Sequence, residues 1–257
     1  MISFRLPMQA QDIYKNFFSD NVVVAHRGAW KKAGVPQNSV ASFREAIRLG
    51  CSGSEFDVHM TADSCLVLSH DRDFFGKVIE NHTYQELSKI KLPNGETIPT
   101  LEQILMEGMK QTGTRLFLEI KSSSTKERTL QSTEKIVEMV NKTGAQPWIF
   151  YITFDYNAAK KIKQLSPSAV VAYLSGDVSP RQLKIDNITG ADYNIGVYKK
   201  EASMIKEAKD LGLSLNVWTI NAAEDMDTFL EYNFDYITTD EPELLLDKLN
   251  NKNNGNL

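Results

Sequence analysis

The sequence predicts an α/β fold, a (β/α)8 TIM barrel formed by one domain over residues 1–257, with its core at about 22–245. The chain of 257 residues has the length of one such barrel. Continuous apolar, β-branched runs alternate with amphipathic segments of helical spacing, which is typical of parallel strands covered by helices. Eight such strand–helix steps follow one another. That number favours a closed barrel over the alternative, an open doubly wound sheet.

The first two strand–helix steps lie within residues 22–70. VVVAH (22–26) is an apolar strand, and SVASFREAIRLG (39–50) has helical spacing and ends at a glycine. SEFDVHM (54–60) alternates with the period of a strand. LVLSH (66–70) follows it after the turn-like TADSC, so these two runs form a strand and hairpin within one step.

A short excursion is expected directly after this hairpin. Residues 71–100 are irregular and rich in turn-forming residues, among them Pro93, Asn94, Gly95 and Pro99. A helix at 101–109 then returns the chain to the barrel. The remaining expected strands are 115–121, 148–154, 169–174, 193–197, 213–220 and 236–240. The remaining expected helices are 129–144, 157–167, 180–190, 200–212, 222–233 and 242–249.

The composition limits which partners and which cellular compartments are expected for the protein. A net charge of −4 leaves no basic footprint, so nucleic acid is not expected as a partner. No apolar run approaches the ~20 residues of a transmembrane helix. The N-terminus lacks the apolar region of a signal peptide, which indicates a cytoplasmic protein or a mature exported form without its leader. Cys51 and Cys65 are expected as free thiols, and the oligomeric state is left open.

Acidic side chains line one face of the strand at 54–60. Because successive side chains of a strand point to opposite faces, Glu55 and Asp57 share a face, and Glu119 lies on the next barrel strand. Three converging carboxylates would repel one another and raise their pKa values. A hard divalent cation, Mg²⁺ or Ca²⁺, removes that conflict because both prefer oxygen ligands. We therefore expect a site for one divalent cation here.

Basic and imidazole side chains stand at the same ends of the predicted strands. Arg27 and Lys121 suit a negatively charged phosphoryl group, although a structural ion-pair network is the alternative. His26 and His70 can act as general acid and general base, because imidazole titrates near neutral pH. The chemistry that this combination indicates is metal-assisted cleavage of a phosphodiester, acting on a small-molecule substrate.

Three other polar residues are interpreted as structural. Asp240 precedes Pro242 and is expected to begin the last helix as a cap. His59 is expected to begin the turn after its strand and to lie beyond the ligand cluster. His82 lies in the excursion and is expected at the surface.

Seven motifs occur in order and together resemble the glycerophosphodiester phosphodiesterase family over about residues 22–245. They are AHRG (25–28), PQNS (36–39), SEFDVHMT (54–61), LVLSHD (66–71), LEIK (118–121), VWTIN (217–221) and ITTDEP (237–242). The resemblance implies a TIM barrel that hydrolyses glycerophosphodiesters to glycerol 3-phosphate and an alcohol. It also implies roles for eight residues by matching position: metal ligands Glu55, Asp57 and Glu119, acid–base residues His26 and His70, phosphate contacts Arg27 and Lys121, and Trp218 on the glycerol side of the pocket.

Two features depart from the family's pattern. Gln37 stands where the family usually has a glutamate, which changes local charge but removes none of the expected ligands or acid–base groups. The excursion after His70 is shorter than the family's usual segment, which leaves the head-group preference open. Two other functions stay as alternatives: a related barrel acting on phosphoinositide or sphingolipid diesters, and a barrel that binds phosphorylated ligands without catalysis.

Overall fold

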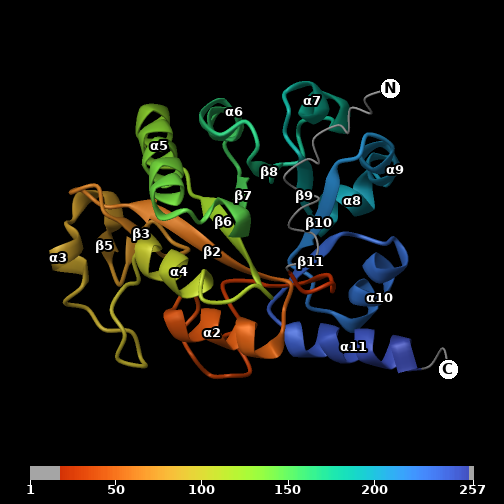
Figure 1. The fold of residues 1–257 in the computed structure, drawn as a ribbon, viewed down its shortest axis with the longest axis horizontal. Helices are drawn as coiled ribbons and strands as arrows, with labels where there is room; N and C mark the ends of the chain where they lie inside the picture. Colours follow the sequence, from red (N-terminus) through yellow and green to blue (C-terminus); the bar gives the residue numbers. More distant parts are fainter. Residues whose placement is uncertain (1–17, 255–257) are drawn as a thin grey trace, which may run out of the picture.

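The computed structural model describes residues 18–254, which form a closed eight-stranded parallel barrel surrounded by helices (Figure 1). Each strand is hydrogen-bonded to the next, and β1 pairs with both β11 and β2, which closes the ring. In order around the barrel, the strands are β1 (Val23–Ala25), β2 (Gly53–Met60), β6 (Arg115–Ile120), β7 (Ile149–Thr153), β8 (Val170–Tyr173), β9 (Gly190–Asn194), β10 (Ser214–Trp218) and β11 (Tyr236–Thr239). The predicted (β/α)8 TIM barrel is confirmed.

Helices cover the outside of the ring and return the chain from one strand to the next (Figure 1). The first of them, α2, shows why these segments begin and end where they do: Ser39 and Ser42 cap its first turn reciprocally, and Gly50 ends it at a φ of 76°. The helices are α2 (Val40–Leu49), α4 (Leu101–Gly108), α5 (Lys126–Thr143), α6 (Tyr156–Leu165), α7 (Pro180–Ile185), α8 (Ile195–Lys200), α9 (Ser203–Asp210), α10 (Ala223–Glu231) and α11 (Pro242–Asn254). Within residues 18–254, none of the helices is both long and apolar enough to cross a membrane.

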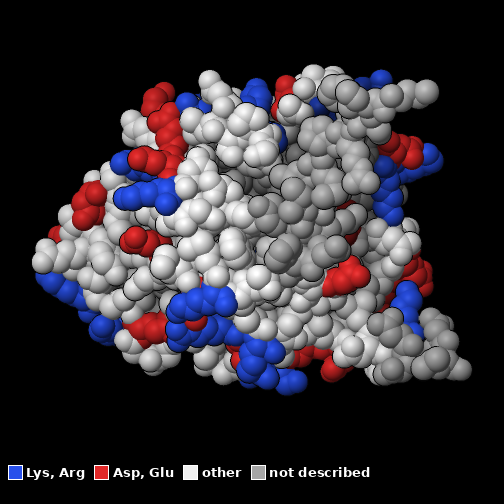
Figure 2. Space-filling view, in the orientation of Figure 1, with Lys and Arg blue, Asp and Glu red and all other residues white. Residues whose placement is uncertain are grey.

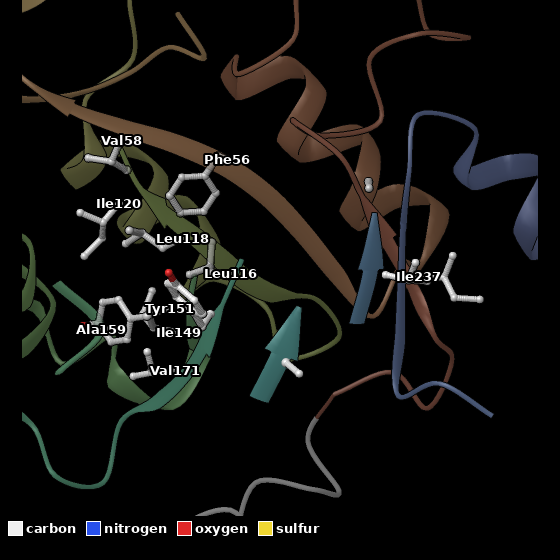
Figure 3. Close-up of a cluster of buried hydrophobic side chains, with 14 of the residues drawn as sticks. Phe56, Val58, Leu116, Leu118, Ile120, Ile149, Tyr151, Ala159, Val171 and Ile237 are labelled. Carbon is white, nitrogen blue, oxygen red and sulfur yellow. The ribbon is translucent and has the colours of Figure 1, made fainter. Parts of the chain in front are cut away.

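Side-chain alternation along β6 separates the outer core from the barrel interior. Leu116, Leu118 and Ile120 point outward and pack with Phe56 and Val58 of β2 in the layer between strands and helices (Figure 3). Each buried side chain of this kind stabilises the fold by about 1.5–3 kcal/mol. The residues between them therefore point inward, because the side-chain period of a strand is two.

Aromatic rings fill the interior of the barrel below its mouth. Phe117 of β6 and Phe150 of β7 stack with ring centroids 4.5 Å apart, and Tyr236 of β11 meets Phe117 edge to face. A Cβ atom on Gly53 would lie 2.5 Å from the ring of Phe117, so this position in β2 needs glycine. Stacked aromatic rings thus pack this part of the barrel interior.

The excursion after β2 forms a small layer of its own, at the left of Figure 1. It contains β3 (Leu66–Leu68), which is antiparallel to β2, the hairpin strands β4 (Asp73–Phe74) and β5 (Lys77–Val78), the short helix η1 (Ile79–Asn81) and α3 (Tyr84–Leu87). A separate apolar cluster holds it together: Val67, Phe74, Ile79, Leu87, Leu92 and Ile98. Glu96 ties the layer to the barrel, because its carboxylate accepts hydrogen bonds from the backbone N–H groups of Val40 and Ala41. The prediction of a short excursion at this point is confirmed.

One predicted strand was placed wrongly. Residues 193–197 were expected to be a strand, but β9 ends at Asn194 and helix α8 follows directly. The side chain of Asn194 accepts a hydrogen bond from the backbone N–H of Gly196 and so caps the helix. The strand instead begins at Gly190, which was assigned to the preceding helix. A Cβ atom there would lie 2.4 Å from Oγ of Ser214, so the close approach of β9 to β10 requires glycine.

Charged side chains of both signs are spread over the surface. On the face shown in Figure 2, blue and red side chains lie mainly toward the rim, and the described residues form no large patch of one sign there. Further carboxylates, those of Glu55, Asp57 and Glu119, are buried inside the mouth of the barrel.

Asp192 is an unusual residue of the barrel interior. It lies on β9 opposite Asn216 of β10, is fully buried, and neither carboxylate oxygen has a hydrogen-bond partner. Burial raises the pKa of its carboxyl group to about 7, because the charged form loses its hydration. An acid whose pKa is higher in the folded than in the unfolded chain makes folding less favourable as the pH rises between those two pKa values.

We expect Asp192→Asn to stabilise the protein above neutral pH. At pH 8 the parent must keep an unpaired carboxylate buried, whereas the variant carries a neutral amide of the same shape. The expected gain is on the order of 2 kcal/mol in the free energy of unfolding, and it should vanish near pH 4. Denaturant unfolding of both proteins at pH 4, 6 and 8 measures it. A loss of stability that is equal at all three pH values would contradict this interpretation.

Candidate active site

Three buried carboxylates from neighbouring strands converge at the C-terminal mouth of the barrel. Glu55 and Asp57 point inward from β2, and Glu119 is the register partner of Asp57 on β6. One ligand oxygen from each of the three lies within 4.8 Å of the others. We call Glu55, Asp57 and Glu119 the acidic triad. The structure therefore places together the three residues that the sequence predicted as metal ligands.

The acidic triad carries the electrostatic conflict that a cation would relieve. Burial raises the pKa of Glu55 well above its usual range, and the negative charges of Asp57 and Glu119 raise it further. Burial and the charge of Asp57 likewise raise the pKa of Glu119 to about 8. Burial also acts to raise the pKa of Asp57, but the Lys121 ammonium and a hydrogen bond from Asn38 outweigh it and lower that pKa.

The donor set of the acidic triad fits a hard divalent cation. All three ligands are carboxylate oxygens, which Mg²⁺ and Ca²⁺ prefer. Oε1 of Glu55 is buried and has no hydrogen-bond partner, so its lone pairs are free to bind a cation. A buried oxygen of this kind is costly unless something binds it. The acidic triad can hold one such cation.

Backbone and amide groups fix the orientation of the two β2 carboxylates. The backbone N–H of Arg27 donates to Oε2 of Glu55 at 2.8 Å. Asn38 binds Asp57 twice: its Nδ2 donates to Oδ2 at 2.8 Å, and its Oδ1 accepts from the backbone N–H at 3.0 Å. Arg27 and Asn38 both have positive φ angles, 55° and 52°, in the loop after β1. Sequence reasoning had given Asn38 no role, although it lies within the motif PQNS.

Two basic side chains stand beside the acidic triad, as predicted. Nζ of Lys121 lies 2.8 Å from Oε1 of Glu119 and 3.2 Å from Oδ1 of Asp57. Burial acts to lower the pKa of Lys121, but these two carboxylates raise it, so the side chain stays charged. Arg27 donates from Nη1 to Oε1 of Gln37 at 2.8 Å, and its Nε lies 3.8 Å from Asp57. A neutral amide thus positions the guanidinium without neutralising it.

Each of the two candidate catalytic histidines has a carboxylate at Nδ1. Nδ1 of His26, directly after β1, lies 2.8 Å from Oδ1 of Asp240, whose Oδ2 accepts a hydrogen bond from Asn221. Nδ1 of His70 lies 2.8 Å from Oδ1 of Asp71. A carboxylate at Nδ1 fixes the ring and leaves Nε2 for a substrate. Burial is the main cause that lowers the pKa of His70.

The expectation that Asp240 would cap the last helix was wrong. Its carboxylate binds His26 and Asn221 instead, while helix α11 begins at Pro242. In the sequence, an aspartate at the end of a strand and before a proline is typical of a helix cap. Its partner His26 is 214 residues away, so local sequence does not indicate the pairing. Asp71 and Asn221 also went unassigned, although both belong to motifs that the sequence analysis singled out.

The other predicted residues lie as follows. The Trp218 ring, at the end of β10, donates from Nε1 to the backbone carbonyl of Asp192 at 3.0 Å. It meets the half-exposed Phe154 ring, just after β7, edge to face at 5.5 Å. These two rings form an aromatic wall of the mouth. His59 is buried outside the acidic triad, and Nδ1 of His82 lies 2.8 Å from the carbonyl of Val78 in the excursion.

Comparison with known proteins gives one consistent result. A model of the glycerophosphoryl diester phosphodiesterase family matches residues 26–244. A glycerophosphodiester phosphodiesterase from Caldanaerobacter subterraneus is 28% identical over 242 residues, covering 88% of this chain and 96% of that protein. The crystal structure of a glycerophosphodiester phosphodiesterase from Parabacteroides distasonis has a TM-score of 0.88 and 40% identity, covering 91% of this chain and 99% of that one.

A third protein shares the fold at lower identity. A phosphodiesterase from Oleispira antarctica, solved in complex with the product sn-glycerol-3-phosphate, has a TM-score of 0.76 at 23% identity. The alignment covers 92% of this chain and 99% of that one.

Proposed function

The chain belongs to the glycerophosphoryl diester phosphodiesterase family and is an enzyme of that activity, and on this premise we propose how it works. We propose that it hydrolyses glycerophosphodiesters to glycerol 3-phosphate and an alcohol, with His26 and His70 as the acid–base pair. We also propose that Glu55, Asp57 and Glu119 hold one divalent cation, Mg²⁺ or Ca²⁺. The observation that carries the proposal is the buried acidic triad, in which Oε1 of Glu55 has no hydrogen-bond partner.

Charge explains how this site would bind a phosphodiester. When bound, the cation would supply the positive charge that polarises the phosphoryl group. Arg27 and Lys121 add two positive charges beside it, and both point to the same acidic residue, Asp57. Backbone, amide and ion-pair contacts already hold these groups in place. They therefore require little reorganisation when charge develops on the phosphoryl oxygens.

The two histidines would perform the proton transfers. One Nε2 takes a proton from the attacking water molecule as the water oxygen forms a bond to phosphorus. The other gives a proton to the alcohol oxygen as the phosphorus–oxygen bond to that alcohol breaks. The carboxylates of Asp240 and Asp71 at Nδ1 hold the two rings in place and leave Nε2 of each ring free to exchange a proton.

The aromatic wall suits the glycerol half of the substrate. Trp218 and Phe154 present an apolar surface across the mouth, and the hydrogen bond from Trp218 to Asp192 holds the indole ring. The phosphodiesterase from Oleispira antarctica was solved with sn-glycerol-3-phosphate. That complex supports glycerol 3-phosphate as the product here as well.

Chelation followed by addition of metal tests the proposal. Turnover of a panel of glycerophosphodiesters is expected to fall to the background rate in EDTA and to return when Mg²⁺ or Ca²⁺ is added. The same panel should include a phosphoinositide and a sphingolipid diester, which are expected to react slowly or not at all. Full activity in chelator after exhaustive metal removal would contradict the role of the acidic triad. A preference for either of the other diesters would change the substrate class.

A further inference from the structure

A cavity on the side of the excursion is lined by His70 and by Asn38, whose side chain binds Asp57 of the acidic triad. It has a volume of about 310 Å³, enough for a small polar head group. Its walls come from the loop before α2, from the end of β3 and from the β4–β5 hairpin. The lining residues that matter here are Gln37, Asn38, His70, Asp71, Asp73 and Phe75. We call this space the hairpin cavity.

Two of these lining residues also bind groups of the proposed phosphate site, which consists of the acidic triad, Arg27 and Lys121. Gln37 binds the Arg27 guanidinium, and Asn38 binds Asp57. A third lining residue, His70, is one of the two candidate catalytic histidines. A diester whose phosphorus lies at the acidic triad therefore has one ester arm at the entrance of the hairpin cavity. The aromatic wall of Trp218 and Phe154 stands at other strands, β10 and β7, and is left for the other arm.

The hairpin turn presents one aromatic ring to solvent. Phe75 is 63% exposed, although large apolar side chains are normally buried. Its backbone has a φ of 50°, and its ring meets the buried Phe74 edge to face at 4.9 Å. The backbone N–H of the next residue, Gly76, donates to Oδ1 of Asp73, which closes the turn. The turn and the contact with Phe74 together hold the ring of Phe75 at the cavity.

The hairpin cavity is lined by acidic rather than basic side chains. Besides His70, its ionisable lining residues are Asp71 and Asp73, and the described lining includes no lysine or arginine. Arg27 and Lys121 stand on the phosphate side instead. A substrate with a negative phosphodiester and a positive group a few bonds away matches this arrangement. Carboxylates and the face of an aromatic ring both attract an ammonium group, and the ring contributes about 0.5–2 kcal/mol.

We propose that the hairpin cavity binds the alcohol half of the substrate and selects alcohols that carry a positively charged ammonium group over neutral polyols. Phe75 and Asp73 determine this selectivity, Phe75 through its ring and Asp73 through its charge. The inference rests on the proposed function, since it needs the phosphodiester to be bound at the acidic triad. It concerns only the arm of the substrate on the side of His70.

The test compares three diesters that share the glycerophosphate half. Glycerophosphocholine and glycerophosphoethanolamine carry an ammonium group, whereas glycerophosphoglycerol carries a neutral polyol. The parent is expected to show a kcat/KM at least about tenfold higher for the two cationic diesters. Phe75→Ala and Asp73→Asn should each lower that preference about three- to tenfold, mainly through KM.

Control variants separate aromatic and charge effects from changes in folding. Phe75→Leu keeps an apolar side chain but loses the ring, and it should lose the preference as Phe75→Ala does. Glu102→Gln removes an exposed carboxylate on α4, outside the hairpin cavity, and should change nothing. An equal preference in the parent and in folded Phe75→Leu and Asp73→Asn would overturn the cavity proposal alone. Absence of turnover for all three diesters in metal-loaded parent would overturn the proposed function itself, and the cavity proposal with it.

Discussion

His26→Ala and His70→Ala are each expected to lower kcat by about 10²–10⁴-fold while the barrel stays folded. Each substitution removes one of the two groups that move a proton during the reaction. Both rings lie at the mouth, partly open to solvent, and neither belongs to the apolar clusters that stabilise the barrel. Turnover of glycerophosphocholine by the metal-loaded variants measures the effect, and circular dichroism with Tm shows whether the fold survives.

His82→Ala is the matched control for these two variants. His82 lies in the same excursion as β3, and its Nδ1 contacts only the backbone carbonyl of Val78. It is expected to keep the parent's rate.

The double variant with His26→Ala and His70→Ala should lose less kcat than the product of the two single losses, because the effects of groups that act in one reaction are not additive. Parent-like rates in both single variants would remove the acid–base assignment.

Glu119→Gln is the second substitution with a large expected effect. It should lower activity and, in the absence of metal, raise stability. The amide keeps the shape of the side chain but removes the charge and one metal ligand. We expect turnover to fall by at least about 100-fold and Mg²⁺ or Ca²⁺ to stabilise the variant less than the parent. In chelator, without metal, we expect Glu119→Gln to be more stable than the parent. The reason is that the substitution removes a buried negative charge that repels Asp57.

The pH dependence of this second effect follows from the pKa of Glu119. Its folded value of about 8 lies above the ordinary value of 4.5, so the metal-free parent loses stability as the pH rises between these two values. Without metal, Glu119→Gln should therefore have the higher Tm at pH 8.5 and a similar Tm at pH 4.5. Glu102→Gln, on the exposed side of α4, should leave both activity and Tm unchanged. A variant that binds metal and turns over like the parent would exclude Glu119 as a ligand.

The sequence predicts the barrel and the acidic triad for the same physical reason. Strands have a side-chain period of two, so Glu55 and Asp57 must share a face with each other and with the inward residues of the neighbouring strand. Glu119 and Lys121 follow by the same rule, and the register of β2 with β6 pairs Asp57 with Glu119. Arguments from local periodicity therefore carry both the fold and the triad.

Other parts of the site depend on contacts that periodicity does not encode. Asp240 binds His26 across 214 residues, and Asn38 binds Asp57 across 19. Taken alone in the sequence, an aspartate or an asparagine at such a position is typical of a turn or a helix cap. The boundary of β9 was misjudged because Ile195 and Val197 extend an apolar run. The strand's actual end is set by the cap at Asn194.

The hairpin cavity could not be predicted at all. Phe75 and Asp73 come close to His70 only because the excursion folds back on its own small core and is fixed to the barrel by Glu96. In the sequence this segment is an irregular stretch with turn residues and two adjacent phenylalanines, Phe74 and Phe75. The domain organisation of the chain, expected as one domain over residues 1–257, stays a prediction.

A crystal structure with Mn²⁺ and glycerol 3-phosphate tests the arrangement most directly. We expect one anomalous peak at about 2.0–2.6 Å from oxygens of Glu55, Asp57 and Glu119, as for oxygen-bound divalent cations. The phosphorus should lie between Nε2 of His26 and Nε2 of His70, with the glycerol against Trp218. A metal peak away from these three carboxylates, or a phosphate that reaches only one of the two imidazoles, would contradict the proposed catalytic centre.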